Sequence, residues 1–112
     1  MKTILVKDII GSKSALSPMK GIKLYEFLSG EINDGNQIIL SFSGIEDLVT
    51  AFSNASFGNL YTAYSIDKIE SHLVLKDLNK VWLNKINQAI ELATDSEVRD
   101  AHNEGMDEVI NS

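Results

Sequence analysis

The chain has 112 residues, of which 44% are hydrophobic and 23% charged, and it contains no cysteine. These values are typical of one globular domain, and they exclude a disulfide framework, a thiolate nucleophile and a sulfur-ligated zinc site. The net charge of −6 at pH 7 disfavours contact with the phosphate backbone of a nucleic acid. Since no apolar run approaches the roughly 20 residues that span a bilayer, we expect a cytoplasmic protein that binds neither nucleic acid nor membrane.

The negative charge is concentrated at the C-terminal end of the sequence. Residues 94–112 hold a single cation, Arg99, against six carboxylates, whereas residues 1–93 are nearly balanced. Apolar residues recur among these carboxylates at helical spacing, which predicts an acidic amphipathic helix that docks on its own domain, on a second subunit or on something else. We therefore divide the chain into an α/β domain, residues 1–93, and an acidic C-terminal helix or tail, residues 94–112. The carboxylates are Asp95, Glu97, Asp100, Glu104, Asp107 and Glu108.

The first part of the chain predicts a strand followed by a helix. Residues 3–10 are rich in β-formers and predict the strand. Ser17 and Pro18 predict the helix start, because serine caps the first turn and proline suits the first helical position. The apolar face of this helix includes Gly21, which permits close approach to a sheet, and the turn signal at residues 33–36 ends it. The other members of that face are Leu24, Leu28 and Ile32.

The middle of the chain predicts a central strand and a second helix. Residues 37–43 contain a continuous apolar run that suits a strand buried on both faces. The next helix is predicted to begin at Ser53, because a cap there makes Phe52 and Phe57 the two positions of a hydrophobic staple.

Residues 69–76 predict a third strand, and Asn79 is predicted to cap a further helix with Trp82 on its buried face. Residues 94–96 are expected to interrupt that helix. The alternation of strand and helix predicts an α/β fold with a small mixed or parallel sheet of three or four strands, helices packed on it, and the acidic C-terminal helix in addition.

One segment carries a resemblance to a known family. The strand Ile38-Ile39-Leu40-Ser41-Phe42 passes through Ser43-Gly44-Ile45 into a loop, which enters a helix at Thr50-Ala51-Phe52-Ser53, with Phe57-Gly58 one turn further on. Gly11-Ser12-Lys13 lies before the first helix. This pattern resembles the STAS-like domains, a bacterial family similar to the anti-sigma factor antagonists and to the STAS regions of sulfate transporters. The resemblance covers about residues 3–93 and implies a non-enzymatic regulatory module that binds another protein, such as a kinase-type ATPase.

In the antagonists, a hydroxyl residue at the start of this helix is phosphorylated by a kinase that also binds the domain. The resemblance therefore implies a partner-binding surface around the helix start, with Thr50 or Ser53 as the phosphoacceptor. The chain departs from the antagonists at Val49, where they have an acidic residue, and at Ala51, which has no hydroxyl. From the residues alone, Ser53 is more simply a helix cap. The implied surface consists of Glu46, Asp47, Thr50, Phe52, Ser53 and Asn54.

No catalytic, cofactor or metal site is predicted. His72 and His102 are the only histidines, and neither has the convergent groups that a nucleophilic triad or a metal centre requires. Glu46 and Asp47 are most simply a solvated loop. We therefore expect no enzymatic activity, no cofactor and no bound metal.

Two other functions are compatible with the sequence. The first is a small acidic inhibitor of phage or mobile-element origin, whose tail imitates a phosphate backbone and occupies a basic site on a nucleic-acid enzyme. The second is a domain that forms a homodimer through its C-terminal helix.

Overall fold

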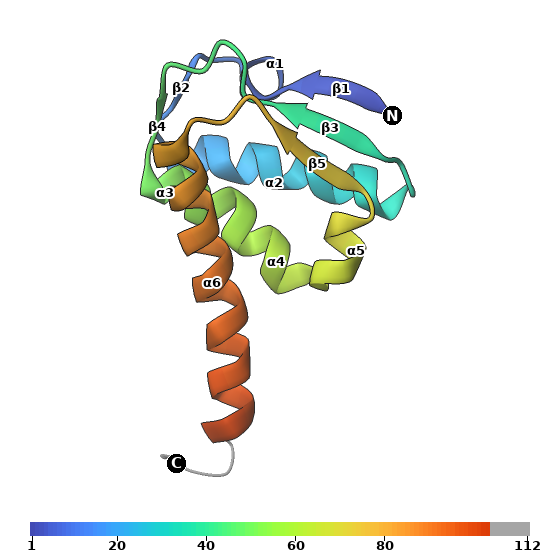
Figure 1. The fold of residues 1–112 in the computed structure, drawn as a ribbon, viewed down its shortest axis with the longest axis vertical. Helices are drawn as coiled ribbons and strands as arrows, with labels where there is room; N and C mark the ends of the chain where they lie inside the picture. Colours follow the sequence, from blue (N-terminus) through green and yellow to red (C-terminus); the bar gives the residue numbers. More distant parts are fainter. Residues whose placement is uncertain (104–112) are drawn as a thin grey trace.

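The computed structural model describes the course of the chain over residues 1–103 and the side chains of residues 1–94. Strands and helices alternate along it (Figure 1). In order, they are β1 (Lys2–Leu5), α1 (Val6–Ile10), β2 (Ser14–Ala15), α2 (Pro18–Asn33), β3 (Ile38–Ser41), β4 (Asp47–Leu48), α3 (Thr50–Ser53), the π-helical turn η1 (Asn54–Gly58), α4 (Asn59–Ala63), α5 (Ile66–Glu70), β5 (Leu73–Lys76) and α6 (Lys80–Asn103).

The described residues form one three-stranded sheet and one shorter ladder, all with parallel pairing. The strand order β1-β3-β5 places β3 in the centre, where Ile38 pairs with Lys2 on one side and with Leu73 on the other. The strands β2 and β4 form a separate two-residue ladder in which Ala15 pairs with Leu48. The predicted α/β class and the central position of the 37–43 strand are confirmed, whereas the short ladder gave no signal in the sequence.

The two faces of the sheet differ in burial. On one face Ile38 and Leu40 are buried against the helices, with α2 and α4 on the same side (Figure 1). On the other face Ile39 is only half-buried, and its ladder neighbour Val74 is 44% exposed. The prediction that the central strand is buried on both faces is therefore wrong, because the helices of the described chain cover only one of them.

The predicted N-terminal strand is half as long as expected. Residues 6–10 form α1, in which Val6 and Ile10, one helical turn apart, both point into the core. Gly11 ends this helix in the left-handed conformation, with φ of 69°. Apolar runs of this length fit a buried helical turn as well as a strand, so composition alone could not separate them.

The first long helix begins as predicted. The Ser17 hydroxyl accepts a hydrogen bond from the Lys20 backbone N–H at 3.2 Å, and Pro18 occupies the first turn. The predicted apolar face is buried. However, Gly21 does not approach the sheet: a Cβ built there would lie 2.6 Å from the carbonyl oxygen of Phe52 and 2.7 Å from Cβ of Ala55. The close approach is therefore between α2 and the segment formed by α3 and η1.

The predicted start of the second helix is wrong. The helix begins at Thr50 with Val49 at the cap position, so Ser53 lies within it and caps nothing. The segment Thr50–Ala63 runs through α3, the π-helical turn η1 and α4 without a break in helical structure. Phe52 and Phe57 are both fully buried, and Phe57 packs with its ring centroid 6.3 Å from that of Phe42. These two phenylalanines are therefore core residues rather than a staple at the helix entrance.

The remaining predictions are partly confirmed. Residues 73–76 form β5, but residues 69 and 70 belong to α5. Asn79 caps α6, since its side-chain oxygen accepts a hydrogen bond from the Trp82 N–H at 2.8 Å, and Trp82 packs against the core. The expected interruption at residues 94–96 is wrong, because α6 is continuous to Asn103. The Thr94 hydroxyl donates to the Ile90 carbonyl at 3.0 Å, within the helix, instead of starting a new one.

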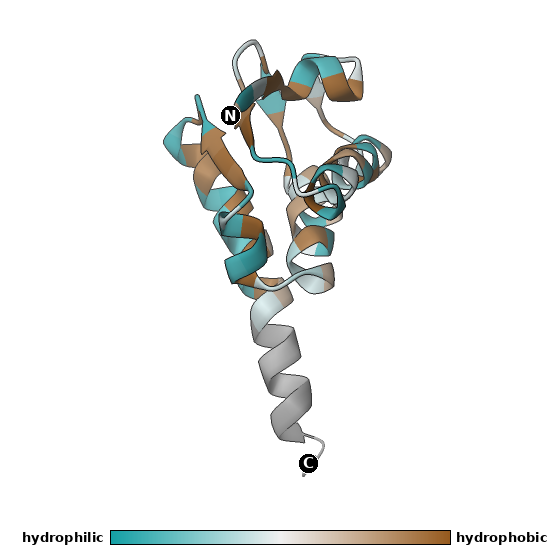
Figure 2. Cartoon of the chain, turned by 90° about the vertical axis from the view of Figure 1, so that its right-hand side faces the viewer, coloured by the Kyte–Doolittle hydropathy of each residue, from teal (hydrophilic) through white to brown (hydrophobic). Residues whose placement is uncertain are grey.

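Hydrophobic and hydrophilic residues are mixed along the helices, as is typical of helices with one buried face (Figure 2). Of the helices that the structure describes, none combines the length and the apolar character needed to cross a membrane.

We predict that Gly21→Ala destabilises the fold by about 1–3 kcal/mol, because its methyl group overlaps the Phe52 carbonyl. Gly30→Ala is the matched control in the same helix. It meets nothing within 4 Å and should stabilise the protein by about 0.5–1 kcal/mol through helix propensity. Chemical denaturation of both variants checks this, and equal effects would contradict the packing of α2.

We also predict an alkaline loss of stability that depends on Tyr61. Burial of its ring, and secondarily the Glu70 carboxylate, raises the pKa of Tyr61 above its ordinary value of 10.0. The unfolded chain therefore releases this proton first, so the stabilisation is complete below pH 10 and is lost as the pH rises further. The free energy of unfolding should fall more steeply in this range for the wild type than for Tyr61→Phe, and parallel curves would contradict the assignment.

Candidate functional site

The loop between β3 and α3 is held rigidly by the main chain on both sides. The Glu46 N–H donates to the Lys13 carbonyl at 2.8 Å, and the Val49 N–H donates to the Ala15 carbonyl at 3.1 Å. The loop side chains Ile45 and Leu48 are buried. This anchoring fixes the backbone of the neighbouring residues Glu46 and Asp47, whose side chains are exposed to solvent.

Helix α6 supports the same loop from the other side. The Lys85 ammonium donates a hydrogen bond to the Leu48 carbonyl at 3.0 Å. Further back, Gly44 takes a left-handed φ of 86°, and a Cβ there would lie 3.0 Å from the Lys7 side chain. The loop is thus enclosed by residues from α1, β2 and α6, elements that lie far apart in the sequence.

Four of the predicted partner-binding residues are exposed around this loop. Glu46 and Asp47 are exposed on the loop, and Thr50 and Asn54, one helical turn apart, are exposed at the start of the helix. No side chain caps the first turn of α3, so the positive end of the helix lies open beside the Thr50 hydroxyl. We name Glu46, Asp47, Thr50 and Asn54 the loop–helix surface.

The prediction is wrong for the other two residues, Phe52 and Ser53. Both are 0% exposed, so neither can contact a partner nor accept a phosphate without opening the core. The physical reason is that both residues lie inside the helix: Phe52 belongs to the core cluster, and Ser53 lies one helical turn before the buried Phe57. Of the two proposed phosphoacceptors, only Thr50 is accessible.

Sequence reasoning missed one exposed apolar residue beside the loop–helix surface. Leu16 is 50% exposed and directly follows Ala15, whose ladder partner Leu48 precedes Val49 and Thr50. The parallel register therefore places Leu16 alongside the start of α3. The two-residue ladder that positions it has no sequence signature, so nothing in the sequence could have indicated this neighbour.

A second missed feature is the hydrogen bond between Ser41 and Asp77 at the carboxyl ends of β3 and β5. The Ser41 hydroxyl donates to the Asp77 carboxylate at 2.5 Å and accepts from the Ser43 N–H at 3.1 Å. Asp77 has a φ of 62°, a left-handed conformation that side chains other than glycine, asparagine and aspartate rarely adopt. The hydrogen bond ties the central strand to the turn that leads into α6.

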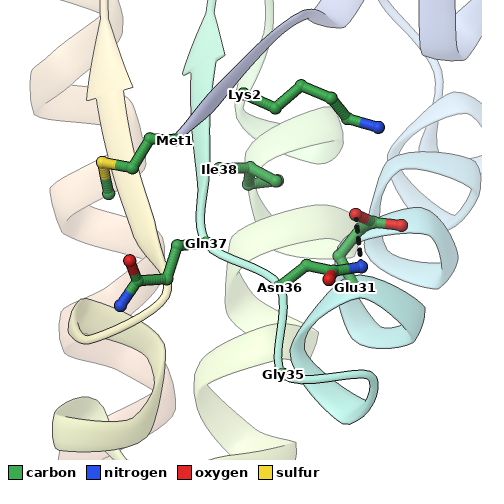
Figure 3. Close-up of a pocket in the computed structure, with 7 residues that line it drawn as sticks. All are labelled: Met1, Lys2, Glu31, Gly35, Asn36, Gln37 and Ile38. Atoms are coloured by element: carbon green, nitrogen blue, oxygen red, sulfur yellow. Dashed lines mark hydrogen bonds between the residues drawn. The ribbon is translucent and has the colours of Figure 1, made fainter.

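The structure contains a hollow at the amino ends of β1 and β3, with a volume of about 590 Å³ (Figure 3). Met1 and Gln37 point to one side of β3 there, and Lys2 and Glu31 to the other. The Glu31 carboxylate already accepts a hydrogen bond from the Asn36 amide at 3.2 Å. The groups lining this hollow therefore do not converge on one point as the groups of a catalytic site do.

Most of the acidic segment lies outside the residues whose side chains the structure describes. Glu97 and Asp100 lie in the part of α6 whose side chains are outside the described residues, and Glu104, Asp107 and Glu108 lie outside them altogether. The inhibitor hypothesis thus stays a prediction. Within the described part of the chain, no three histidine, aspartate or glutamate residues are grouped so that they could hold a metal ion.

We predict opposite effects for two buried serines in this helix. The Ser53 hydroxyl has no hydrogen-bond partner, so Ser53→Ala should leave stability unchanged or raise it by about 1 kcal/mol. The Ser56 hydroxyl donates to the Phe52 carbonyl at 2.8 Å, so Ser56→Ala should destabilise the protein by about 0.5–1.5 kcal/mol. Thermal unfolding of both variants measures the difference in stability. A larger loss of stability for Ser53→Ala than for Ser56→Ala would contradict the hydrogen bonding assigned to the two serines.

The chain was compared with curated proteins, solved structures and protein families. Neither a curated protein nor a solved structure matched the chain. Residues 20–81, more than half of the chain, match the STAS-like domain of unknown function (DUF4325). The match extends from α2 through the loop–helix surface to the start of α6, and so it includes the segment that carries the resemblance in the sequence. The chain therefore belongs to this STAS-like family.

Proposed function

We propose that this protein is a regulatory module that binds another protein through the loop–helix surface. Membership of the STAS-like family supports a regulatory or interaction module, since domains of this type are typically non-enzymatic. The observation that carries the proposal is the exposure of Asp47, Thr50 and Asn54 on a backbone that β2 and α6 hold in place. Exposed polar residues on a rigid scaffold are the usual form of a recognition surface.

The chemistry of the surface suggests how the partner is held. Glu46 and Asp47 supply negative charge, Thr50 and Asn54 supply hydrogen-bonding groups, and Leu16 adds an exposed apolar side chain at the edge. Protein interfaces commonly combine apolar contacts with hydrogen bonds and charged groups. A kinase-type ATPase or another regulator is the partner class that the family resemblance favours.

We further propose that phosphorylation of Thr50 releases this partner. Its hydroxyl is exposed and lies at the open amino end of the helix, where a phosphate is stabilised by the helix dipole. The phosphate adds a charge of about −1.5 to −2 at pH 7. In the interface, this strongly hydrated group would have to lose water beside the Asp47 carboxylate, and its bulk and this desolvation cost would separate the partner from the helix start.

The binding proposal is tested by affinity capture from the lysate of the native host, with quantitative mass spectrometry. Asp47→Lys should abolish capture of the partner because it reverses a charge within the loop–helix surface. Asp34→Lys is the matched control. Asp34 is exposed after α2, in the turn before the amino end of β3, and this variant should capture the partner as the wild type does. Capture that is unchanged in both variants, or lost in both, would contradict the assigned surface.

The phosphorylation proposal has its own test. Thr50→Val keeps the shape of the side chain and should retain the captured partner, whereas Thr50→Glu should lose it. The phosphopeptide containing Thr50 should be detected in protein purified from the native host. Equal capture by both variants would remove the regulatory role of Thr50 and leave the binding proposal standing.

A further inference from the structure

Helix α6 has a contact face and, on its other side, two exposed apolar residues. Its contact face, with Ile86 and Ala89 buried, packs on η1 and α4. On the opposite face Val81 is 61% exposed and Leu92 is 57% exposed. The helix then runs past α4 and away from the rest of the molecule (Figure 1).

The exposed residues Val81, Gln88 and Leu92 lie in a stripe along the helix, and the half-buried Lys85 lies in the same row beside β4. Val81 and Leu92 are eleven residues apart, close to three full turns, and Lys85 and Gln88 fall between them at spacings of three and four residues. Gln88 is uncharged, and the Lys85 ammonium is engaged by the Leu48 carbonyl at 3.0 Å. The stripe therefore has an apolar residue at each end and no carboxylate between them.

The charged residues of α6 are distributed opposite to the arrangement that stabilises a free helix. Residues 80–90 contain Lys80 and Lys85 and no carboxylate, whereas the sequence from residue 91 to 103 contains Glu91 and three further carboxylates against one arginine. A helix has partial positive charge at its start and partial negative charge at its end. Cations at the start and carboxylates toward the end therefore oppose the dipole, and α6 is stabilised if a neighbour of complementary charge lies antiparallel to it.

We propose that α6 pairs antiparallel with α6 of a second copy of this chain. An antiparallel twofold pair centred between Val81 and Leu92 places the basic start of each helix beside Glu91 of the other. The apolar stripe then matches itself, with Val81 of one copy against Leu92 of the second.

The flank of the helix fits the same register. Lys80, Asn84 and Glu91 follow one another at spacings of four and seven residues and so share one flank, next to the stripe. A twofold axis brings equal flanks together, which sets Lys80 of one copy beside Glu91 of the second. Within residues 1–94, neither side chain has an ion-pair partner in its own chain, so both are available for this contact.

The first test is the mass of the full chain in solution, measured by light scattering over a range of concentrations. The expected mass is twice the 12.4 kDa of one chain. Leu92→Glu should reduce it to the mass of one chain, while the fold is retained by circular dichroism because the side chain is exposed. Met19→Glu, at an 80% exposed apolar residue of α2, is the matched control and should leave the mass doubled.

A charge exchange tests the antiparallel register. Lys80→Glu and Glu91→Lys should each weaken the dimer, because each places like charges together, and the double variant should restore it. A wild-type chain of single mass at every concentration would overturn the proposal. Dissociation by Met19→Glu, or a double variant weaker than both single variants, would overturn the proposed interface.

Discussion

The contact between Gly21 of α2 and the helix that starts at Thr50 is the constraint on which the rest of the structure depends. A Cβ at position 21 would lie 2.6 Å from the Phe52 carbonyl, so the two helix backbones touch without side chains between them. This approach sets how deeply the second helix lies under the sheet and therefore which of its residues are buried. The accessible Thr50 and the inaccessible Ser53 are both consequences of the same backbone contact.

The parts of the fold that follow from local chemistry were predictable from the sequence. The cap at Ser17 and the apolar run in β3 each act within a few residues, and the structure has both. The errors lie where tertiary packing decides between two conformations. Residues 6–10 and residues 69–70 are helical although their composition suits strands, because single helical turns place their apolar side chains in the core.

The loop before the second helix was predictable, but the burial of the residues around it was only partly so. The structure has a loop there, and Glu46, Asp47 and Thr50 are exposed. The sequence pattern misplaces the helix start by three residues, since Val49 has no capping side chain to mark it. Because successive residues of a helix turn by about 100°, Phe52 and Ser53 face the core while Thr50 and Asn54 face solvent.

The strand order has a consequence for synthesis of the protein in the cell. The central strand receives both of its neighbours from about 35 residues away in opposite directions of the chain. Such non-local pairing delays folding until the distant partners are present. On the ribosome, β3 emerges early, but its backbone on the β5 side stays unpaired until residue 76 has left the exit tunnel. During that interval the nascent chain exposes an apolar strand, and so chaperone demand should be concentrated in this window of translation.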